Sequence, residues 1–140
     1  MNKKNYIFIV FIILFILFLT GCSENGVECG LTGKWNIVDI EFEESSVDVD
    51  DVDGLLVITY NDTYELDMEY EVNGIEVEMD DYGELKACAY NKYIQFFSDD
   101  DDGSTLHGDR DSLNCIYNLN GSNLTIYNDD ITMEFTKNYQ

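Results

Sequence analysis

The alternating pattern of residues 64–80 constrains the fold of this chain more than any other stretch. Apolar and acidic side chains alternate from residue 64 to 72 and again from residue 75 to 80. Asn73-Gly74 lies between the two runs and is a strong signal for a two-residue type I′ turn. Because successive side chains of a strand point to opposite faces, the pattern predicts an antiparallel hairpin with one buried apolar face and one exposed acidic face.

A two-residue turn also fixes the register of this hairpin. Val72 then opposes Ile75, and three like-charged pairs lie directly across the ladder: Glu71 with Glu76, Glu69 with Glu78, and Asp67 with Asp80. Such pairs are destabilising. The face is either a solvated outer surface whose repulsion salt screens, or a surface that binds a basic partner or a divalent cation such as calcium, which prefers carboxylate oxygens.

Short strands separated by turn residues continue through the rest of the chain. The pattern predicts about nine strands and no helical stretch beyond residue 21. The strands are expected at residues 33–42, 55–60, 64–72, 75–80, 85–90, 93–97, 113–119, 124–126 and 131–135, with an acidic loop at 43–53, a break at Tyr82-Gly83 and a polar loop at 98–112. Such a meander removes its exposed edges by closing. We therefore expect an all-β, antiparallel up-and-down barrel of about eight or nine strands.

The first expected strand carries an irregularity in its pattern. Trp35 and Ile37 belong to one face, whereas Val38, Ile40 and Phe42 belong to the other. The two-residue period therefore slips between Ile37 and Val38, as it does at a β-bulge. A long strand that bends at this point would help to close a barrel.

The N-terminus resembles a bacterial lipoprotein signal peptide. Two lysines precede an apolar run over residues 6–19, which ends in Leu19-Thr20-Gly21-Cys22, a close match to the lipobox. The run is shorter than the roughly 20 residues of a spanning helix. The resemblance implies that residues 1–21 are removed, that Cys22 becomes the first residue and carries acyl chains such as palmitate, and that residues 22–32 form a tether. The domain at residues 33–140 would then be exported and anchored to a bacterial membrane, facing the periplasm or the cell exterior.

The charge balance excludes one class of partner. Cleavage after residue 21 leaves 119 residues with 29 acidic and five basic side chains, a formal charge of −24. A nucleic-acid binder needs a basic face, so nucleic acid is excluded as an electrostatic partner. The same balance argues against a large contact with anionic lipid, because like charges repel there. The length suits one domain with a modest core.

Gly33-x-Trp35 at the start of the first strand is similar to the Gly-x-Trp motif of lipocalins and related calycins. Together with the following loop and the successive hairpins, it makes residues 31–137 resemble the lipocalin-like domains of small bacterial secreted lipoproteins. The resemblance implies an eight-stranded barrel whose interior holds an apolar ligand and whose base is closed by Trp35. Lipocalins usually pack this tryptophan against a basic residue near the last strand, and Lys137 is the candidate here.

The inward-facing side chains of the expected strands are the candidate ligand site. A barrel of eight strands is just wide enough either to fill with side chains or to hold one small ligand. The interior is therefore either a cup for an apolar or aromatic molecule or a packed core. The candidates are Trp35, Tyr64, Leu66, Met68, Tyr70, Val77, Phe96, Tyr117, Ile126, Met133 and Phe135.

Cysteines and loop carboxylates provide weaker candidates. Cys29, Cys88 and Cys115 allow one disulfide in an exported protein and leave one thiol over, and each of the three pairings is open. Metal binding by thiols lacks the usual Cys-x-x-Cys spacing. Residues 98–109 partly match a calcium loop, although the bidentate glutamate is missing. In that match the candidate metal ligands are Asp100, Asp102 and Asp109.

No motif points to catalysis. The one histidine, His107, lies in an acidic stretch, and no Gly-x-Ser-x-Gly elbow is present. We therefore expect a protein that is not an enzyme and has no cofactor. The leading hypothesis is a lipid-anchored envelope lipoprotein whose barrel binds a small apolar ligand, without an identified protein partner. The alternative is an interaction module that uses the acidic outer sheet.

Overall fold

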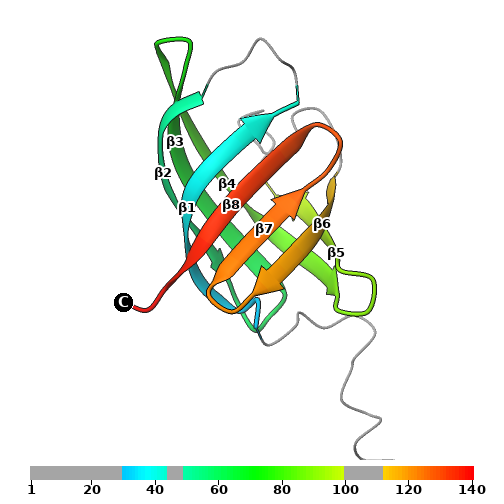
Figure 1. Cartoon of the computed structure of the whole chain (residues 1–140). Coiled ribbons are helices and arrows are strands. Elements are labelled where there is room, and N and C mark those ends of the chain that lie inside the picture. The colour runs from blue at the N-terminus through cyan, green and yellow to red at the C-terminus, as the bar shows by residue number, and fades with distance from the viewer. Residues whose placement is uncertain (1–29, 44–48, 100–111) are drawn as a thin grey trace, which may run out of the picture.

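The chain folds into a closed antiparallel β-barrel. The structure is a computed structural model, and it describes residues 30–43, 49–99 and 112–140. Each strand pairs with the next, and the last pairs with the first (Figure 1). No helix in these ranges is long and apolar enough to cross a membrane. The eight strands are β1 (Gly33–Phe42), β2 (Val49–Ile58), β3 (Thr63–Val72), β4 (Ile75–Cys88), β5 (Tyr93–Ser98), β6 (Leu113–Asn120), β7 (Asn123–Tyr127) and β8 (Ile131–Asn138).

The up-and-down order gives the barrel two distinct ends. We call the first end the base: it holds the start of β1, the end of β8 and the connections at 59–62, 89–92 and 121–122. We call the opposite end the mouth: it holds the end of β1, the turn at 73–74 and the turn at 128–130. The β3–β4 turn projects furthest at the mouth (Figure 1).

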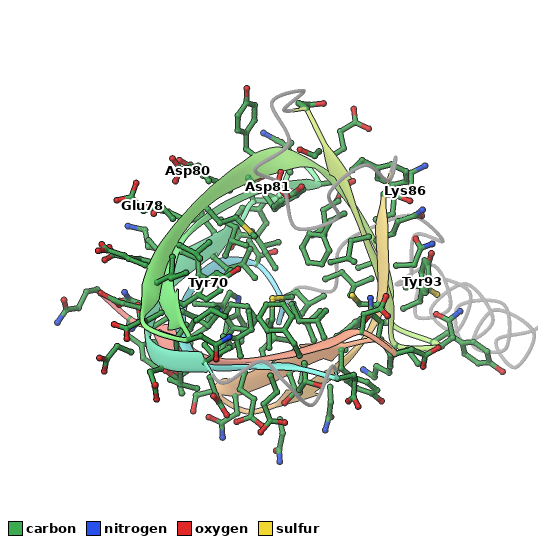
Figure 2. The ribbon with its side chains drawn as sticks, turned by 90° about the horizontal axis from the view of Figure 1, so that it is seen from above. Tyr70, Glu78, Asp80, Asp81, Lys86 and Tyr93 are labelled. Carbon is green, nitrogen blue, oxygen red and sulfur yellow. The ribbon has the colours of Figure 1, made fainter. Side chains whose placement is uncertain are left out.

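The predicted hairpin register is confirmed. Val72 pairs with Ile75, and the three like-charged pairs lie opposite each other as expected: Glu71 with Glu76, Glu69 with Glu78, and Asp67 with Asp80. The turn residues Asn73 and Gly74 both have positive φ angles, of 51° and 79°, as a type I′ turn requires. Figure 2 shows Tyr70 on the inner side of the ribbon and Glu78 and Asp80 outside it.

The predicted break at Tyr82-Gly83 is wrong, which is why the barrel has eight strands and not nine. β4 runs through both residues, with Tyr82 exposed and Gly83 buried. A Cβ atom at Gly83 would overlap the carbonyl oxygen of Phe97 on β5. Glycine is therefore needed here for close approach of two backbones inside a strand, a role that a sequence reads equally well as a turn.

The predicted bulge in β1 is confirmed. Pairing with β8 shifts register between Ile37 and Asp39, so Val38 has no partner there and is 49% exposed. The bulge takes up this extra residue, so Ile40 faces inward and is buried as Ile37 is. The sequence pattern placed Val38 and Ile40 on one face; the bulge separates them.

β2 begins earlier than the pattern predicts. Residues 49–53, expected in the acidic loop, already pair with β3, with a register shift between Asp50 and Asp53. Asp51 has a φ of 48° at this irregularity. The shift leaves Val49 and Val52 packed against the core, although acidic residues surround them in the sequence.

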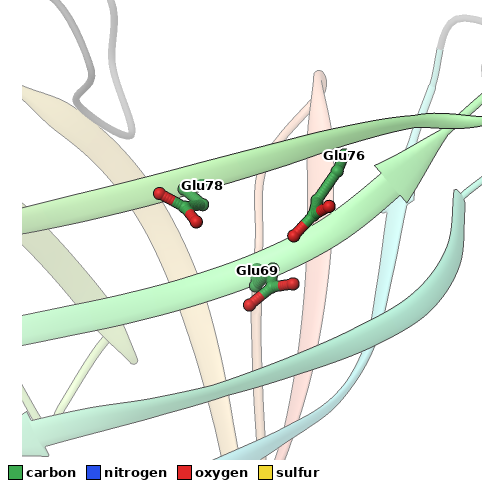
Figure 3. A group of neighbouring side chains, drawn as sticks. All are labelled: Glu69, Glu76 and Glu78. Atoms are coloured by element: carbon green, nitrogen blue, oxygen red, sulfur yellow. The ribbon is translucent and has the colours of Figure 1, made fainter.

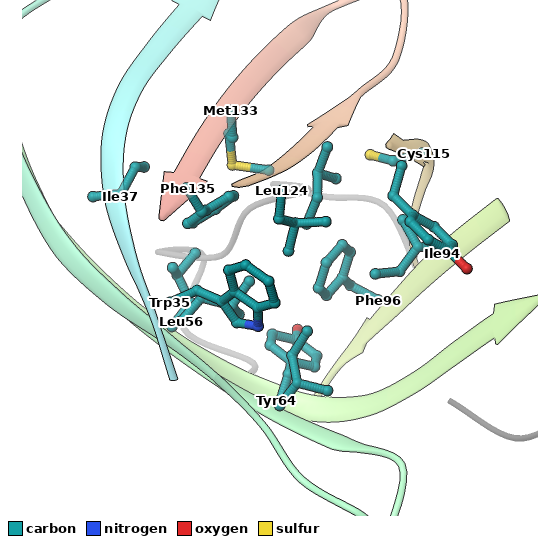
Figure 4. Close-up of a cluster of buried hydrophobic side chains, with 14 of the residues drawn as sticks. Trp35, Ile37, Leu56, Tyr64, Ile94, Phe96, Cys115, Leu124, Met133 and Phe135 are labelled. Carbon is teal, nitrogen blue, oxygen red and sulfur yellow. The ribbon is translucent and has the colours of Figure 1, made fainter. Parts of the chain in front are cut away.

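Ten of the eleven predicted interior residues are buried. The exception is Val77, which is half-buried near the mouth and packs against the core. Around the middle of the barrel the side chains meet in contact, including the edge-to-face pair Tyr64 and Phe96 with ring centroids 4.9 Å apart. Figure 4 shows this cluster, with Trp35, Phe135 and Leu124 beside that pair.

Candidate functional site

The base of the barrel is plugged by the segment that leads into β1. Leu31 and Trp35 are both buried, and the Trp35 Nε1 atom donates a hydrogen bond to the Leu31 carbonyl oxygen at 2.8 Å. Lys137 Nζ lies 4.1 Å from the centroid of the Trp35 ring. The same ammonium donates to the carbonyl oxygens of Thr32 at 2.6 Å and Gly30 at 3.3 Å.

This arrangement fulfils the expected packing of Trp35 against Lys137. A cation over an indole face is attracted by the ring quadrupole, and two carbonyl oxygens add charge-assisted hydrogen bonds. Partial burial lowers the pKa of Lys137 from its ordinary value. The base is therefore a packed closure, and the mouth is the end where a ligand would approach the interior.

The mouth is lined by apolar side chains that the barrel leaves half-buried. Tyr70 is the last fully inward residue on β3, and its ring centroid lies 6.0 Å from that of Phe42 on β1. Half-buried apolar side chains from β2, β3 and β4 also pack against the core at this end. The half-buried apolar residues of the mouth are Phe42, Val49, Val52, Val72, Val77 and Met79. Apolar surface left partly open at a barrel mouth is typical of a ligand entrance.

Asp81 is the functional candidate that the sequence analysis missed. Its side chain is 1% exposed and is the single buried charged group in the described ranges. Asp81 lies on the inward side of β4, between Met79 and Gly83, and Ser98 Oγ donates a hydrogen bond to its Oδ1 atom at 2.6 Å. The acids of β4 that face outward all have even numbers, whereas Asp81 has an odd number and therefore faces inward. This alternation could have identified Asp81 from the sequence. The wrongly predicted break at Tyr82-Gly83 ended the expected strand before Asp81.

Tyr64 adds a second buried polar group to the interior. Its hydroxyl oxygen is buried beside the Asp81 and Ser98 side chains, but no hydrogen bond of good geometry reaches it from the described residues. Burial, followed by the negative charge of Asp81, raises the pKa of Tyr64 well above its ordinary value. The phenol therefore stays neutral and keeps a proton to donate. Unsatisfied buried hydroxyls are rare and are candidates for contact with a ligand or a water molecule.

The acidic outer face forms a carboxylate cluster. Glu69, Glu76 and Glu78 each present an oxygen within 4.8 Å of the others on the exposed side of β3 and β4 (Figure 3). A hydrogen bond with Glu76 and its negative charge raise the pKa of Glu69. The predicted face of like charges is therefore real, and three oxygens converge where a hard cation could bind.

A shallow groove of about 390 Å³ lies on the outer wall and not at the mouth. It is bounded by outward side chains such as Val57, Glu65 and Tyr82, near the point where Asp99 follows β5. The Asp99 amide donates to the Tyr82 carbonyl oxygen at 2.9 Å, which holds that edge in place. Of the residues that line this groove, Tyr64 alone was predicted as a site residue from the sequence.

The structure bears on one of the three possible disulfide pairings, that of Cys88 with Cys115. Both residues are free thiols, so this disulfide is not formed. Burial raises the pKa of Cys115 to about 12, so this thiol stays protonated and unreactive.

Several predicted residues lie outside the described ranges, namely Cys22, Cys29, Asp100, Asp102, His107 and Asp109.

No family model, curated protein or solved structure matches this chain. The site is therefore assigned from its own geometry: a closed base, a packed middle, two buried polar groups and an apolar mouth.

Proposed function

We propose that this chain is an exported, lipid-anchored envelope protein whose barrel binds a small apolar ligand at the mouth. The observation that carries the proposal is the asymmetry of the interior: the base is plugged by Trp35 and Lys137, whereas apolar side chains at the mouth stay half-buried. Burying such surface with an apolar molecule is favourable by about 25 cal/mol per Å². The anchor is supported by the lipobox that ends at Cys22.

The buried polar groups favour ligands that carry a polar group of their own. A ligand that extends from the mouth towards the middle of the barrel could donate a hydrogen bond to, or accept one from, the buried polar group formed by the Tyr64 hydroxyl with Asp81 and Ser98. A few placed polar groups in an apolar pocket commonly fix the orientation of a bound molecule. We therefore expect amphiphilic molecules with one small polar group to bind better than pure hydrocarbons.

The proposal is tested with the neutral fluorescent probe N-phenyl-1-naphthylamine added to the protein that begins at Cys22. We expect a saturable rise in fluorescence, which Val77→Asp and Met79→Asp each weaken at least about tenfold, because a charge at the mouth must be desolvated. Val38→Asp is the matched control, because Val38 is exposed on the outer wall. Absence of saturable uptake, or equal loss in the control, contradicts the proposal. Circular dichroism verifies that each variant is folded.

A second function is favoured by one observation, the convergence of Glu69, Glu76 and Glu78. This cluster would bind a divalent cation or a basic segment of a partner protein. Calorimetric titration with calcium tests the cation directly. Heat that Glu76→Gln abolishes and Glu84→Gln leaves unchanged supports it, whereas no heat with the parent protein contradicts it.

A further inference from the structure

The base of the barrel carries the three most exposed tyrosines in the described ranges. Tyr60 in the β2–β3 turn is 85% exposed, Tyr90 in the β4–β5 turn is 98% exposed, and Tyr139 after β8 is 83% exposed. Two of these residues lie in connections and the third follows the last strand, and the barrel topology brings all three to one end. Tyrosine is enriched at membrane–water interfaces, where its ring lies at the level of the lipid headgroups.

Lysines gather towards the same end. Lys34 is the second residue of β1, and Lys86 is the third residue from the end of β4. Lys92 is in the β4–β5 turn, and Lys137 is next to last in β8. They are all the lysines of the described ranges. The described base connections and the three strand residues next to each contain two acidic side chains, those of Asp62 and Glu65, against these four lysines.

Acidic residues occupy the opposite end. The described mouth segments carry no lysine or arginine. Their acidic residues include Glu43, Asp50, Asp51, Asp53, Glu71, Glu76, Asp99, Asp129 and Asp130. The strongly negative total charge of this protein is therefore distributed unevenly, with the mouth acidic and the base mixed.

The length of chain before the base limits how far the base can lie from a lipid on Cys22. Seven residues separate Cys22 from Gly30, and a fully extended chain spans about 3.4 Å per residue, so the reach is roughly 27 Å. Because the tether joins the barrel at the base, the base is the end that this reach keeps near the bilayer.

We propose that the base of the barrel docks on the surface of the membrane that holds Cys22, with Tyr60, Tyr90 and Tyr139 at the level of the headgroups. This inference rests on the proposed lipid anchor and adds an orientation to it. The exposed lysines near the base, Lys34, Lys86 and Lys92, then lie close to anionic headgroups, where each basic residue is attracted. The mouth points away from the bilayer and stays open to a ligand.

The strongly negative total charge of the chain would repel anionic lipid, but most of this charge in the described ranges lies far from the base. A ten-residue strand such as β3 rises about 33 Å along its axis, or about 25 Å along a barrel with strands tilted by about 40°. Electrostatic interactions at physiological salt are screened over about 8 Å. The acids of the mouth therefore contribute little repulsion at the docked base.

The docking is tested with the acylated chain, isotope-labelled and held in nanodiscs of phosphatidylcholine and phosphatidylglycerol. A small share of the lipids carries a gadolinium chelate on the headgroup, which broadens nearby amide signals. We expect strong loss of signal at Tyr60, Tyr90 and Gly121, and none at Gly74 on the mouth. The triple variant Y60S/Y90S/Y139S should lose this gradient, whereas the control Y82S/Y127S, which alters exposed tyrosines of the barrel wall, should keep it.

Two outcomes overturn the proposal in distinguishable ways. An intact mass without acyl chains on the same sample removes the anchor and with it the proposed function. An acylated chain with equal broadening at Gly74 and Gly121, or with unaffected base tyrosines, leaves the anchor standing and contradicts the docked orientation. The latter result would make the base a surface for another protein.

Discussion

Gly83 is the residue on which the shape of the barrel depends most sharply. It sits inside the longest strand, β4, where the backbone of β5 comes so close that no Cβ atom fits. Gly54 on β2 is similar, because a Cβ atom there would lie 2.5 Å from the Asp67 carbonyl oxygen. Both glycines permit close approach within paired strands, as glycine does where a barrel bends.

Replacing Gly83 by alanine should therefore cost about 3 kcal/mol or more of stability, because the backbone of two paired strands must separate. Gly121→Ala is the matched control. Its φ angle is 61° and nothing lies near its Cβ position, so we expect a loss of about 1 kcal/mol from the left-handed conformation alone. Urea unfolding measures both. Equal losses would show that close approach at Gly83 is unimportant.

Lys137 joins the base plug to the last strand through one ammonium group. Lys137→Ala removes the contact with the Trp35 ring and two hydrogen bonds to carbonyl oxygens, so we expect a loss of about 1–2 kcal/mol. Lys137→Arg keeps a cation and donors and should recover most of it. Lys86→Ala, which removes a cation above the Phe97 ring on the exposed wall, should cost much less. Thermal unfolding measures these losses of stability. Equal losses for Lys137→Ala and Lys86→Ala would contradict the proposed role of Lys137 in closing the base.

At the scale of elements, the β3–β4 hairpin holds like charges in register on its outer face. The raised pKa of Glu69 arises from Glu76 first, and a carboxyl group with a raised pKa in the folded state binds its proton more tightly there than in the unfolded state. The stabilising contribution is present at acidic pH and is lost as pH rises through the folded pKa. The face therefore opposes folding at neutral pH.

Glu69→Gln should raise the melting temperature at pH 7, and this gain should vanish as the pH falls below the ordinary range of glutamate. Glu65→Gln is the control, because Glu65 faces Val57 and Tyr82 across the ladders and has no acid opposite. Melting curves of the parent and both variants across pH provide the test. A gain at Glu69 that does not depend on pH, or an equal gain at Glu65, would rule out the paired repulsion.

The bulge in β1 sets which side chains of this strand face the core. Val38 is the extra residue that the bulge takes up, so Ile37 and Ile40 both face inward. Deleting Val38 leaves Ile37, Asp39 and Ile40 in strict alternation with their β8 partners unchanged, so we expect this variant to keep a cooperative unfolding transition. Deleting the paired residue Asn36 should turn Ile37 to the outer face, because a slip of one residue inverts the orientation of the side chains beyond it. Urea unfolding compares the two deletions; equal damage by both, or loss of the transition in the Val38 deletion alone, would contradict the assigned register.

The elements that sequence reasoning predicted are those with a strict period. The alternation around Asn73-Gly74 fixed strand, turn and register together, and the slip at Val38 located the bulge. The pattern failed where glycine or acid had a role set by the partner strand. Gly83 was predicted in a break, Asp81 fell outside every expected strand, and Val49 and Val52 were predicted in a loop, because the position of each depends on a backbone neighbour distant in sequence.

At the scale of the whole molecule, the barrel has two unlike ends. The base combines a packed plug, exposed tyrosines and nearby lysines, whereas the mouth combines half-buried apolar residues with an acidic rim. The alternating turns of a meander make this separation possible, because every second connection returns to the same end. These unlike ends agree with the proposal that the base lies at a membrane and that the mouth binds a small molecule.

The most direct test of ligand binding at the mouth is amide chemical-shift mapping of the protein during titration with N-phenyl-1-naphthylamine. The account predicts saturable shifts at Val52, Tyr70 and Met79 and unchanged signals at Lys34 and Gly121 in the base. Shifts confined to Val57 and Tyr82 in the outer groove, or no saturable shifts at all, would contradict it.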